Sequence, residues 1–274
     1  MPDLMHGKRG LVMGVANDHS IAWGIARMLA AHGAKLAFTY QGDALGKRVK
    51  PLAASVGTDL VLPCDVEDIA SVDAVFAEIA RSWGTFDFLV HAVGYSDRAQ
   101  LTGRYADTTR ENFLRTMLIS CFAFTEAAKR AAALMPNGGA MLTLTYNGSE
   151  RAMPNYNAMG LAKAALEASV RYLAVDFGAQ AIRVNAISAG PIRTLAGSVI
   201  GDSRMMFAFQ HRHSPLHRGV TLDEIGGAAL YLLSDLSTGV TGEIHYVDSG
   251  YNVITMPHPD ALRADQERGG GDAG

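Results

Sequence analysis

The chain has 274 residues, of which 49% are hydrophobic and 19% charged, and its formal net charge is −3. This length fits one large α/β domain with a substantial core, and the composition is that of a globular protein. The slightly acidic balance argues against nucleic acid and anionic membrane surfaces as partners. The only two cysteines, Cys64 and Cys121, lie far apart, which argues against a disulfide framework or zinc site and favours a reducing compartment.

The N-terminal stretch MPDLMHGKRGLVMG lacks the pattern of a signal peptide. No uncharged apolar run reaches the roughly 18 residues that a membrane span needs. We therefore expect a cytoplasmic protein that does not bind membranes. His211, His213 and His217 are too loosely spaced to indicate a metal site, and we expect none.

Short β-branched or apolar segments alternate along the chain with longer segments of helical periodicity. The predicted strands are 9–14, 35–40, 59–64, 87–94, 140–146, 182–188 and 243–248. The predicted helices are 20–32, 42–57, 70–83, 109–133, 155–177 and 222–235. Several strands are apolar on both faces, as buried parallel strands must be. The pattern predicts an α/β fold: a single Rossmann-like, doubly wound domain, with a seven-stranded parallel sheet and helices on both faces.

The domain is expected to span residues 1–257. The remaining segment, 258–274, ends in the polar and glycine-rich sequence RADQERGGGDAG. Such a composition cannot bury a core, so we predict a flexible C-terminal tail without chemistry of its own.

The turn after the first strand, within MGVANDHSIAWGIA, has small residues where the chain passes from strand to helix. Gly14 and Ala16 let the backbone approach a pyrophosphate, and Ser20 is placed to cap the helix whose N-terminal amides would bind the anion. Gly14, Ser20 and Ile21 are therefore candidate cofactor residues. Because the spacing is not G-x-G-x-x-G, a plain strand-loop-helix turn stays open as an alternative.

Gln41 ends the second predicted strand, where dinucleotide-binding folds place the residue that contacts the adenosine ribose. An acidic residue there favours NAD, and an arginine accommodates the phosphate of NADP. Gln41 is neutral and no basic residue adjoins it, although Lys47 and Arg48 follow one or two helical turns later. This position therefore favours NADH.

Two further strand ends carry candidate cofactor residues. After the third strand, Asp65 can accept from the adenine amino group and Val66 can offer its backbone; alternatively, Asp65 is only an acid at a helix entry. After the fourth strand, Val93 and Gly94 are small enough to lie against the adenosine side of a dinucleotide. A strand end that simply requires glycine is the competing interpretation.

Tyr156 and Lys163 lie seven residues apart in the predicted helix NYNAMGLAKAALEA. Seven residues of α-helix turn through about 700° and rise about 10.5 Å, so the two side chains share one face. Tyr146 ends the preceding strand at the edge where open α/β sheets bind ligands. Packing alone can explain each residue separately, but their combination downstream of a possible cofactor turn indicates an active site.

The segments TYNGSERAMPNYNAMGLAKAALEASVRYLA and IRVNAISAGPIRTLA resemble the enoyl-acyl carrier protein reductases of bacterial type II fatty acid synthesis. This family is a divergent branch of the short-chain dehydrogenases/reductases. The resemblance runs from GKRGLVMGVA to GEIHYVDSGY and so covers most of the chain. Most short-chain dehydrogenases have Tyr-x3-Lys, but position 160 is Gly160, and the lysine arrives at Tyr-x6-Lys, as in the enoyl reductase branch.

The resemblance implies that NADH reduces the trans-2 double bond of enoyl thioesters carried by acyl carrier protein. Negative charge would collect on the thioester oxygen, where the Tyr156 hydroxyl would stabilise it. Lys163 would hold the nicotinamide ribose and add positive potential, and Tyr146 would shape the acyl pocket as a third catalytic candidate. Ser96 and Tyr156 are the candidate substrate-binding residues.

The segment after the sixth strand also matches the family. Ile192 and Thr194 correspond to positions that contact the nicotinamide carboxamide and the pyrophosphate. The segment from about 193 to 218 is expected to form a mobile lid over an acyl chain. A packed helical hairpin without this role is the alternative. The resemblance further implies a homotetramer, built partly through the helices at 109–133 and 155–177.

Acyl carrier protein is acidic, so a basic patch is expected at the pocket mouth. The candidates are Arg193, Arg204, Arg212 and Arg218, although ordinary surface arginines would look the same in sequence. Two other functions stay open. One is a reductase of this fold that acts on another enoyl thioester or a carbonyl; the other is a non-catalytic dinucleotide sensor, which would be expected to have lost Tyr156 or Lys163.

Overall fold

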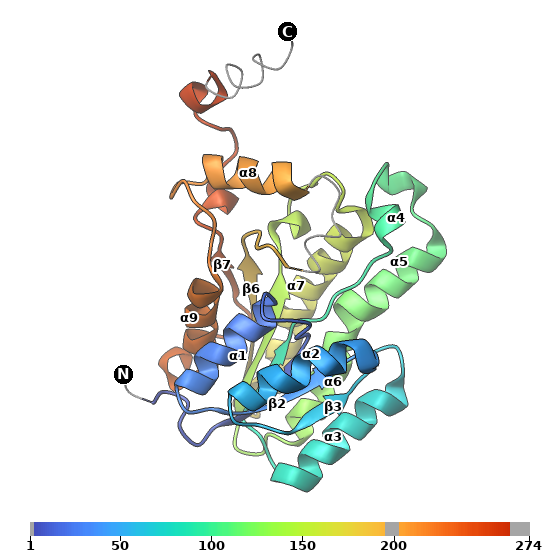
Figure 1. The fold of residues 1–274 in the computed structure, drawn as a ribbon, viewed down its shortest axis with the longest axis vertical. Helices are drawn as coiled ribbons and strands as arrows, with labels where there is room; N and C mark the ends of the chain where they lie inside the picture. Colours follow the sequence, from blue (N-terminus) through green and yellow to red (C-terminus); the bar gives the residue numbers. More distant parts are fainter. Residues whose placement is uncertain (1–2, 195–202, 264–274) are drawn as a thin grey trace.

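The structure is a computed structural model that describes residues 3–194 and 203–263 (Figure 1). Its centre is one seven-stranded sheet in the order β3-β2-β1-β4-β5-β6-β7, and every pair of neighbouring strands is parallel. The predicted fold class is confirmed. The strands are β1 Arg9–Met13, β2 Lys35–Tyr40, β3 Val61–Pro63, β4 Phe88–His91, β5 Gly139–Thr145, β6 Ile182–Ala189 and β7 Ile244–Val247.

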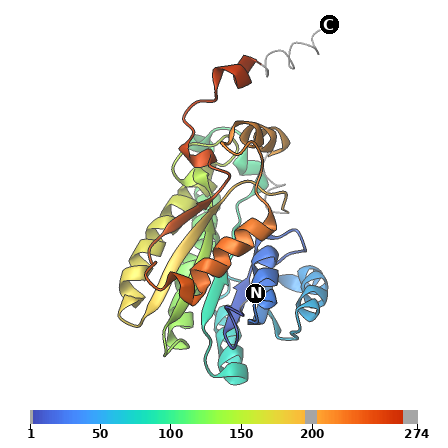
Figure 2. The ribbon, with the colours of Figure 1, turned by 90° about the vertical axis from the view of Figure 1, so that its left-hand side faces the viewer.

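Helices cover both faces of the sheet, as Figures 1 and 2 show. They are α1 Ile21–Ala31, α2 Gly42–Ser55, α3 Ile69–Trp83, α4 Arg98–Leu101, α5 Arg110–Met117, α6 Ala123–Ala133, α7 Asn157–Gly178, α8 Ser203–His213 and α9 Leu222–Leu233. A π-helical turn, Leu118–Phe122, joins α5 to α6. No helix in the described part of the chain is long and apolar enough to cross a bilayer.

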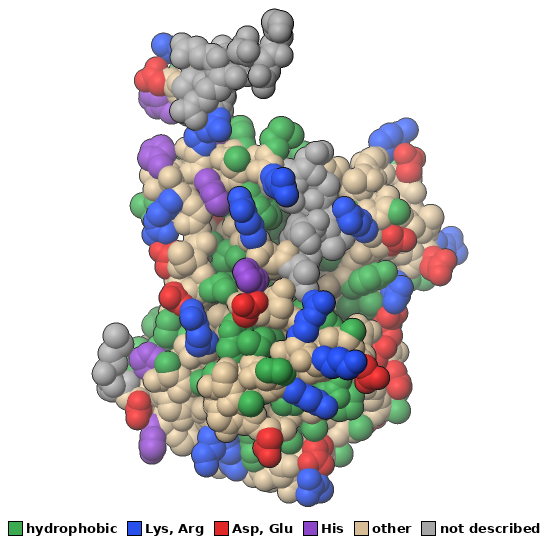
Figure 3. Space-filling view, in the orientation of Figure 1, with side chains coloured by type: hydrophobic (Ala, Val, Ile, Leu, Met, Phe, Trp, Pro, Cys, Tyr) green, Lys and Arg blue, Asp and Glu red, His purple; other side chains and the backbone are tan. Residues whose placement is uncertain are grey.

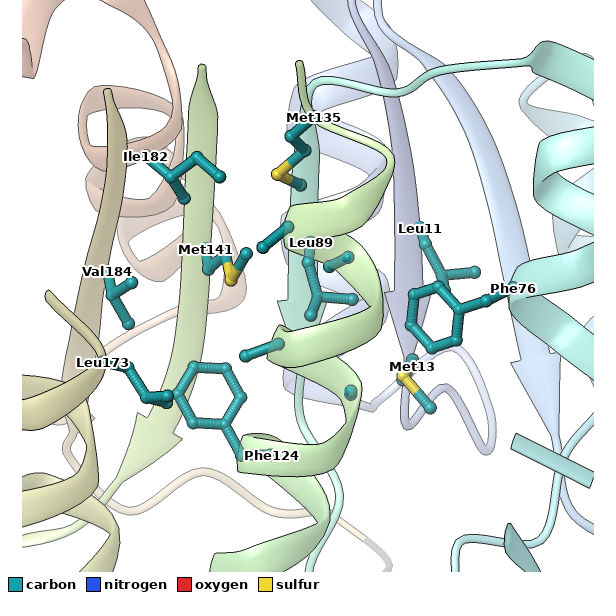
Figure 4. Packing of buried hydrophobic residues seen from close by; sticks show 14 of the residues in the cluster. Leu11, Met13, Phe76, Leu89, Phe124, Met135, Met141, Leu173, Ile182 and Val184 are labelled. Carbon is teal, nitrogen blue, oxygen red and sulfur yellow. The ribbon is translucent and has the colours of Figure 1, made fainter. Parts of the chain in front are cut away.

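The strands are apolar on both faces because each face packs on its own layer of helices. In β1, Leu11 and Met13 face the layer of α3, α6 and α7, whereas Val12 faces the layer of α1, α2 and α9. Figure 4 shows the first layer, where Phe124 of α6 and Phe76 of α3 fill the space above the sheet. Full burial of such side chains stabilises the fold by about 1.5–3 kcal/mol each.

Several predicted element ends shift by one to three residues, and the helices depart further from the prediction in two respects. The helix predicted over 109–133 is interrupted at Leu118–Phe122, where the turn widens to the π-helical form. The side chains of that turn contact residues far away in the chain, so helical periodicity gave no sign of it. The helices α4 and α8 were not among the predicted helices; α4 has four residues, too few to show a helical period.

Candidate active site

A pocket of about 690 Å³ opens at the carboxyl ends of the strands. The sheet order reverses between β1 and β4, and open α/β sheets bind ligands at such a switch point. All but one of the predicted site residues line this pocket: Gly14, Ser20, Ile21, Gln41, Val66, Val93, Gly94, Ser96, Tyr146, Tyr156, Lys163, Ile192 and Thr194.

Asp65 is the exception among the described residues that were predicted for the site. Its neighbours Cys64 and Val66 line the pocket, but its own carboxylate accepts the N–H of Glu67 at 3.0 Å. The Asp65 N–H in turn donates to Ser71 Oγ at 2.9 Å. Asp65 therefore organises the turn that enters α3, and its contact with adenine stays a prediction.

The turn after β1 brings backbone close to the pocket in two ways. Gly14 has φ of 101°, and a Cβ there would lie 2.2 Å from the carbonyl oxygen of Ala92, so only glycine fits. The prediction that Ser20 caps α1 is wrong. Its Oγ turns back into the loop and accepts the N–H groups of Ala16 and Asn17, at 3.0 and 3.1 Å.

The missing cap leaves donors at the N-terminus of α1. The first turn uses the Ser20 carbonyl for the N–H groups of Trp23 and Gly24. Among the described residues, none accepts from the N–H of Ile21 or Ala22, and both residues line the pocket. Free amides at a helix N-terminus are a site for an anion such as a pyrophosphate.

The two tyrosines and the lysine meet on the other side of the pocket. Tyr146 follows β5 directly, and Tyr156 immediately precedes α7; their ring centroids lie 5.3 Å apart, edge to face at 72°. Lys163 lies two turns along α7, and its Nζ donates to the carbonyl oxygen of Leu144 at 2.7 Å. The end of β5 and the start of α7 thus form one wall.

Burial sets the charge states of these groups. It raises the pKa of Tyr156 far above the usual range, with smaller contributions from Tyr146 and Glu167, so the phenol is a neutral donor. Burial raises the pKa of Tyr146 to about 12, against the opposing hydrogen bond from Gln210. Burial lowers the pKa of Lys163 to about 8, partly offset by Cys121 and Glu167.

Close packing explains why position 160 is glycine. A Cβ on Gly160 would lie 2.8 Å from the carbonyl oxygen of Gly148, in the short turn after β5. A Cβ on Gly148 would in turn lie 2.5 Å from the ring of Tyr156. A lysine four residues after Tyr156 therefore has no room, whereas Lys163 does.

The family model described as enoyl-(acyl carrier protein) reductase matches residues 14–252. This chain belongs to that family. The resemblance stated from the sequence is confirmed.

Relatives match the chain over nearly its whole length. The enoyl-[acyl-carrier-protein] reductase [NADH] 2 of Rhizobium meliloti is 71% identical over 96% of this chain and 98% of its own length. The enoyl-[acyl-carrier-protein] reductase [NADH] 1 of the same organism is 60% identical over 94% of this chain and 95% of its own length. A crystal structure of FabI from Candidatus Liberibacter asiaticus, 59% identical, superposes with a TM-score of 0.93 over 94% of this chain and all of that one. The crystal structure of the enoyl-(acyl-carrier-protein) reductase of Anaplasma phagocytophilum, described in complex with NAD, is 56% identical. It superposes with a TM-score of 0.91 over 94% of this chain and 98% of that one.

The pocket of this enoyl reductase family member fits a dinucleotide. The glycine at position 14 admits close approach, and the amides of Ile21 and Ala22, from which no described residue accepts, suit a pyrophosphate. Gln41, at the end of β2, lines the same pocket and is uncharged. Within residues 3–194 and 203–263, no group of three His, Cys, Asp or Glu side chains is arranged to hold a metal ion.

Two buried partners of the site were not predicted from the sequence. Gln210 of α8 is 3% exposed, and its Nε2 donates to the Tyr146 hydroxyl at 2.5 Å. Glu167 is also buried and accepts from Thr145 Oγ1 at 2.6 Å, one helical turn beyond Lys163. Neither residue type is diagnostic without its tertiary neighbour, so neither was predicted.

The predicted lid lies partly outside the described residues, since 195–202 belong to neither described range. Its described part contains α8, whose Met206 and Phe207 line the pocket. The predicted tail likewise is described only up to residue 263. Figure 3 shows several Lys and Arg side chains on and around α8. Arg193 and Arg204 are exposed, and Arg218 pairs with Glu224 at 2.6 Å.

Proposed function

We propose that this chain uses NADH to reduce the trans-2 double bond of enoyl thioesters carried by acyl carrier protein. Its relatives are named enoyl-[acyl-carrier-protein] reductase [NADH]. The observation that carries this proposal is the placement of Tyr156 and Lys163 on one side of a pocket with dinucleotide-binding features. This makes the chain an oxidoreductase of fatty acid biosynthesis.

Bound NADH supplies a hydride for the β-carbon of the enoyl group, and negative charge then develops on the thioester oxygen. Tyr156 donates a hydrogen bond to that oxygen, and its raised pKa keeps the donating proton in place before the reaction. Such a contact is strongest in the transition state, where the charge is greatest, and therefore raises kcat. Burial of the Tyr146 and Tyr156 pair keeps water away and strengthens the interaction.

Lys163 has two tasks in the proposal. Its ammonium group, which donates to the Leu144 carbonyl oxygen in this structure, holds the ribose hydroxyls next to the nicotinamide when NADH is bound. It also adds positive potential near the developing enolate. We assign the nucleotide to the lining residues Gly14, Ser20, Ile21, Gln41, Val66, Val93, Gly94, Ile192 and Thr194, with Asp65 behind them, and the substrate to Ser96 and Tyr156.

The proposal includes a cytoplasmic homotetramer that receives acyl carrier protein near α8. Two buried free cysteines agree with a reducing compartment. Large apolar side chains exposed on α5, the π turn and α7 support the predicted subunit interface: Leu114, Phe122, Leu161, Tyr172 and Val175. The proposal also includes one domain over 1–257, with a lid over 193–218, and a tail over 258–274. Light scattering tests the tetramer.

A spectrophotometric assay tests the reaction. We expect NADH absorbance to fall with crotonyl thioester and to stay constant with acetoacetyl thioester. Oxidation with the ketone alone would assign the chain to carbonyl reduction. NADH binding without turnover of either thioester would indicate a dinucleotide sensor.

A further inference from the structure

A buried polar stripe runs along α5 and the following π turn, on the side that faces the pocket segment Tyr95–Asp97. It consists of Asn112, Thr116 and Ser120, which are 5%, 0% and 0% exposed. A buried helix face is ordinarily apolar, and buried polar groups are costly unless each finds a hydrogen-bond partner. The proposed mechanism uses none of these three side chains.

Each stripe residue holds the three-residue segment Tyr95–Asp97, which lines the pocket. Ser120 Oγ accepts the Tyr95 N–H at 2.8 Å and donates to the Tyr95 carbonyl at 2.9 Å. Thr116 Oγ1 donates to Ser96 Oγ at 2.9 Å. Asn112 accepts the Asp97 N–H at 2.9 Å through Oδ1 and donates to Ser96 Oγ at 3.3 Å through Nδ2.

The π turn explains how three residues at four-residue spacing reach one segment. Four residues of α-helix turn through about 400°, so a third residue would be rotated by about 80° from the first. The wider turn at Leu118–Phe122 turns less per residue and brings Ser120 back toward Tyr95. A π turn inside a helix frequently marks a functional position.

Contacts hold the Tyr95–Asp97 wall at one end and tie the segment after it to the start of α7. The Arg115 guanidinium lies over the Tyr95 ring, 4.5 Å from its centroid, and bonds both carboxylate oxygens of Glu67 at 2.8 and 2.7 Å. Beyond the wall, Asn157 Nδ2 donates to the carbonyl oxygen of Gln100 at 3.0 Å. Asn157 follows Tyr156 directly, so the segment after the wall is tied to the start of α7.

We propose that Asn112, Thr116 and Ser120 are positioning residues that fix the Tyr95–Asp97 wall for the enoyl chain. A loop of this kind loses conformational entropy when it becomes ordered. If the wall is already ordered before the substrate arrives, this loss does not weaken substrate binding. Specificity for the thioester, and not affinity for NADH, depends on the stripe. The inference rests on the proposed function, since it names the substrate side of that same pocket.

Thr116→Val tests the inference, because it removes the hydroxyl and keeps the shape. Thr143→Val is the matched control: Thr143 is equally buried at 1% and donates to the His91 carbonyl, but does not contact the wall. We expect Thr116→Val to raise KM for crotonyl and longer enoyl thioesters by about 5- to 30-fold, because a buried hydrogen bond is lost. Thr143→Val should change KM by less than about twofold, and both variants should bind NADH as the wild type does in a fluorescence titration.

Two further variants complete the experiment. Thr116→Ser keeps the hydroxyl and should restore KM to within about twofold of wild type. Ser120→Ala, which only shortens a side chain, should raise KM in the same direction and serves if Thr116→Val does not fold. Equal KM values for the Thr116→Val and Thr143→Val proteins would overturn the inference. So would a Thr116→Val protein whose affinity for NADH falls by the same factor as its KM for the thioester rises. A wild-type protein that leaves enoyl thioesters unreduced would instead overturn the proposed function.

Discussion

Raising the pH is expected to discharge Lys163 before NADH binds. Burial lowers the pKa of Lys163 from its ordinary value of 10.5 to about 8, with Cys121 and Glu167 opposing the shift. The neighbouring His91 is neutral at neutral and alkaline pH, because burial lowers its pKa to about 3. The pKa values of Cys64 and Tyr146, which also line the pocket, are raised to about 11 and about 12. Among these shifted groups, Lys163 titrates nearest to neutral pH.

The size of the effect follows from that pKa. With a pKa of about 8, about ten molecules carry the ammonium for each neutral one at about pH 7, and the ratio inverts at about pH 9. If only the ammonium form binds the ribose, kcat/KM for NADH falls about tenfold between those two values, with a slope of one decade per pH unit at its limit. The kcat/KM profile is the right observable, because it reports groups of the free enzyme.

The stability contribution of Lys163 has the opposite sign, which separates the two effects. Between about pH 8 and 10.5 the unfolded chain binds the proton that the folded chain has released, so the free energy of unfolding rises with pH through this group. Activity should therefore fall over the same pH range in which loss of the buried charge raises the free energy of unfolding.

The assay is an initial-rate profile in NADH for wild type and for Lys163→Arg, whose side chain stays charged throughout. We expect the falling limb to disappear in the arginine variant, whatever its absolute rate. A flat wild-type profile, or an unchanged limb in Lys163→Arg, would refute the reasoning.

Three further substitutions test other parts of the site. Tyr156→Phe should lower kcat by about 100- to 1000-fold and leave the NADH dissociation constant within about twofold in equilibrium titration, because one oxyanion donor is lost; wild-type turnover would contradict its role. Gln210→Met removes the donor to Tyr146 and should lower kcat/KM for the enoyl thioester by about fivefold, and the double variant with Tyr146→Phe should show non-additive losses; strictly additive losses would show that the two side chains act independently. Gly160→Ala should lower the free energy of unfolding by about 1–3 kcal/mol in denaturant titrations, because its Cβ would meet a backbone carbonyl at 2.8 Å. The control, Gly227→Ala, lies in a helix with open space around it and should be neutral or stabilising; an equal loss at both positions would contradict the packing argument.

Local patterns predicted the elements well where burial repeats along the segment. The second strand was predicted at 35–40 and forms at Lys35–Tyr40, and the helix predicted over 222–235 forms at Leu222–Leu233. The polar contacts were predicted less well. Ser20 occupies the expected N-cap position, but its hydroxyl accepts from two N–H groups of the loop and makes no bond to the helix amides.

The sequence by itself determined the alternation of strands and helices, the family, and the pairing of Tyr156 with Lys163 on one helix face. The alternation and the pairing follow from periodicity or spacing within a short stretch, which local chain geometry converts into structure. The family follows from a resemblance that runs over most of the chain. Only the tertiary structure decided why position 160 must be glycine, that Gln210 binds Tyr146, and that a stripe on α5 and the π turn holds the pocket segment Tyr95–Asp97. These contacts join residues 12 to 64 positions apart, as for positions 148 and 160 or 146 and 210. Hydrogen bonding and close packing depend on distance in space, which spacing along the chain does not encode.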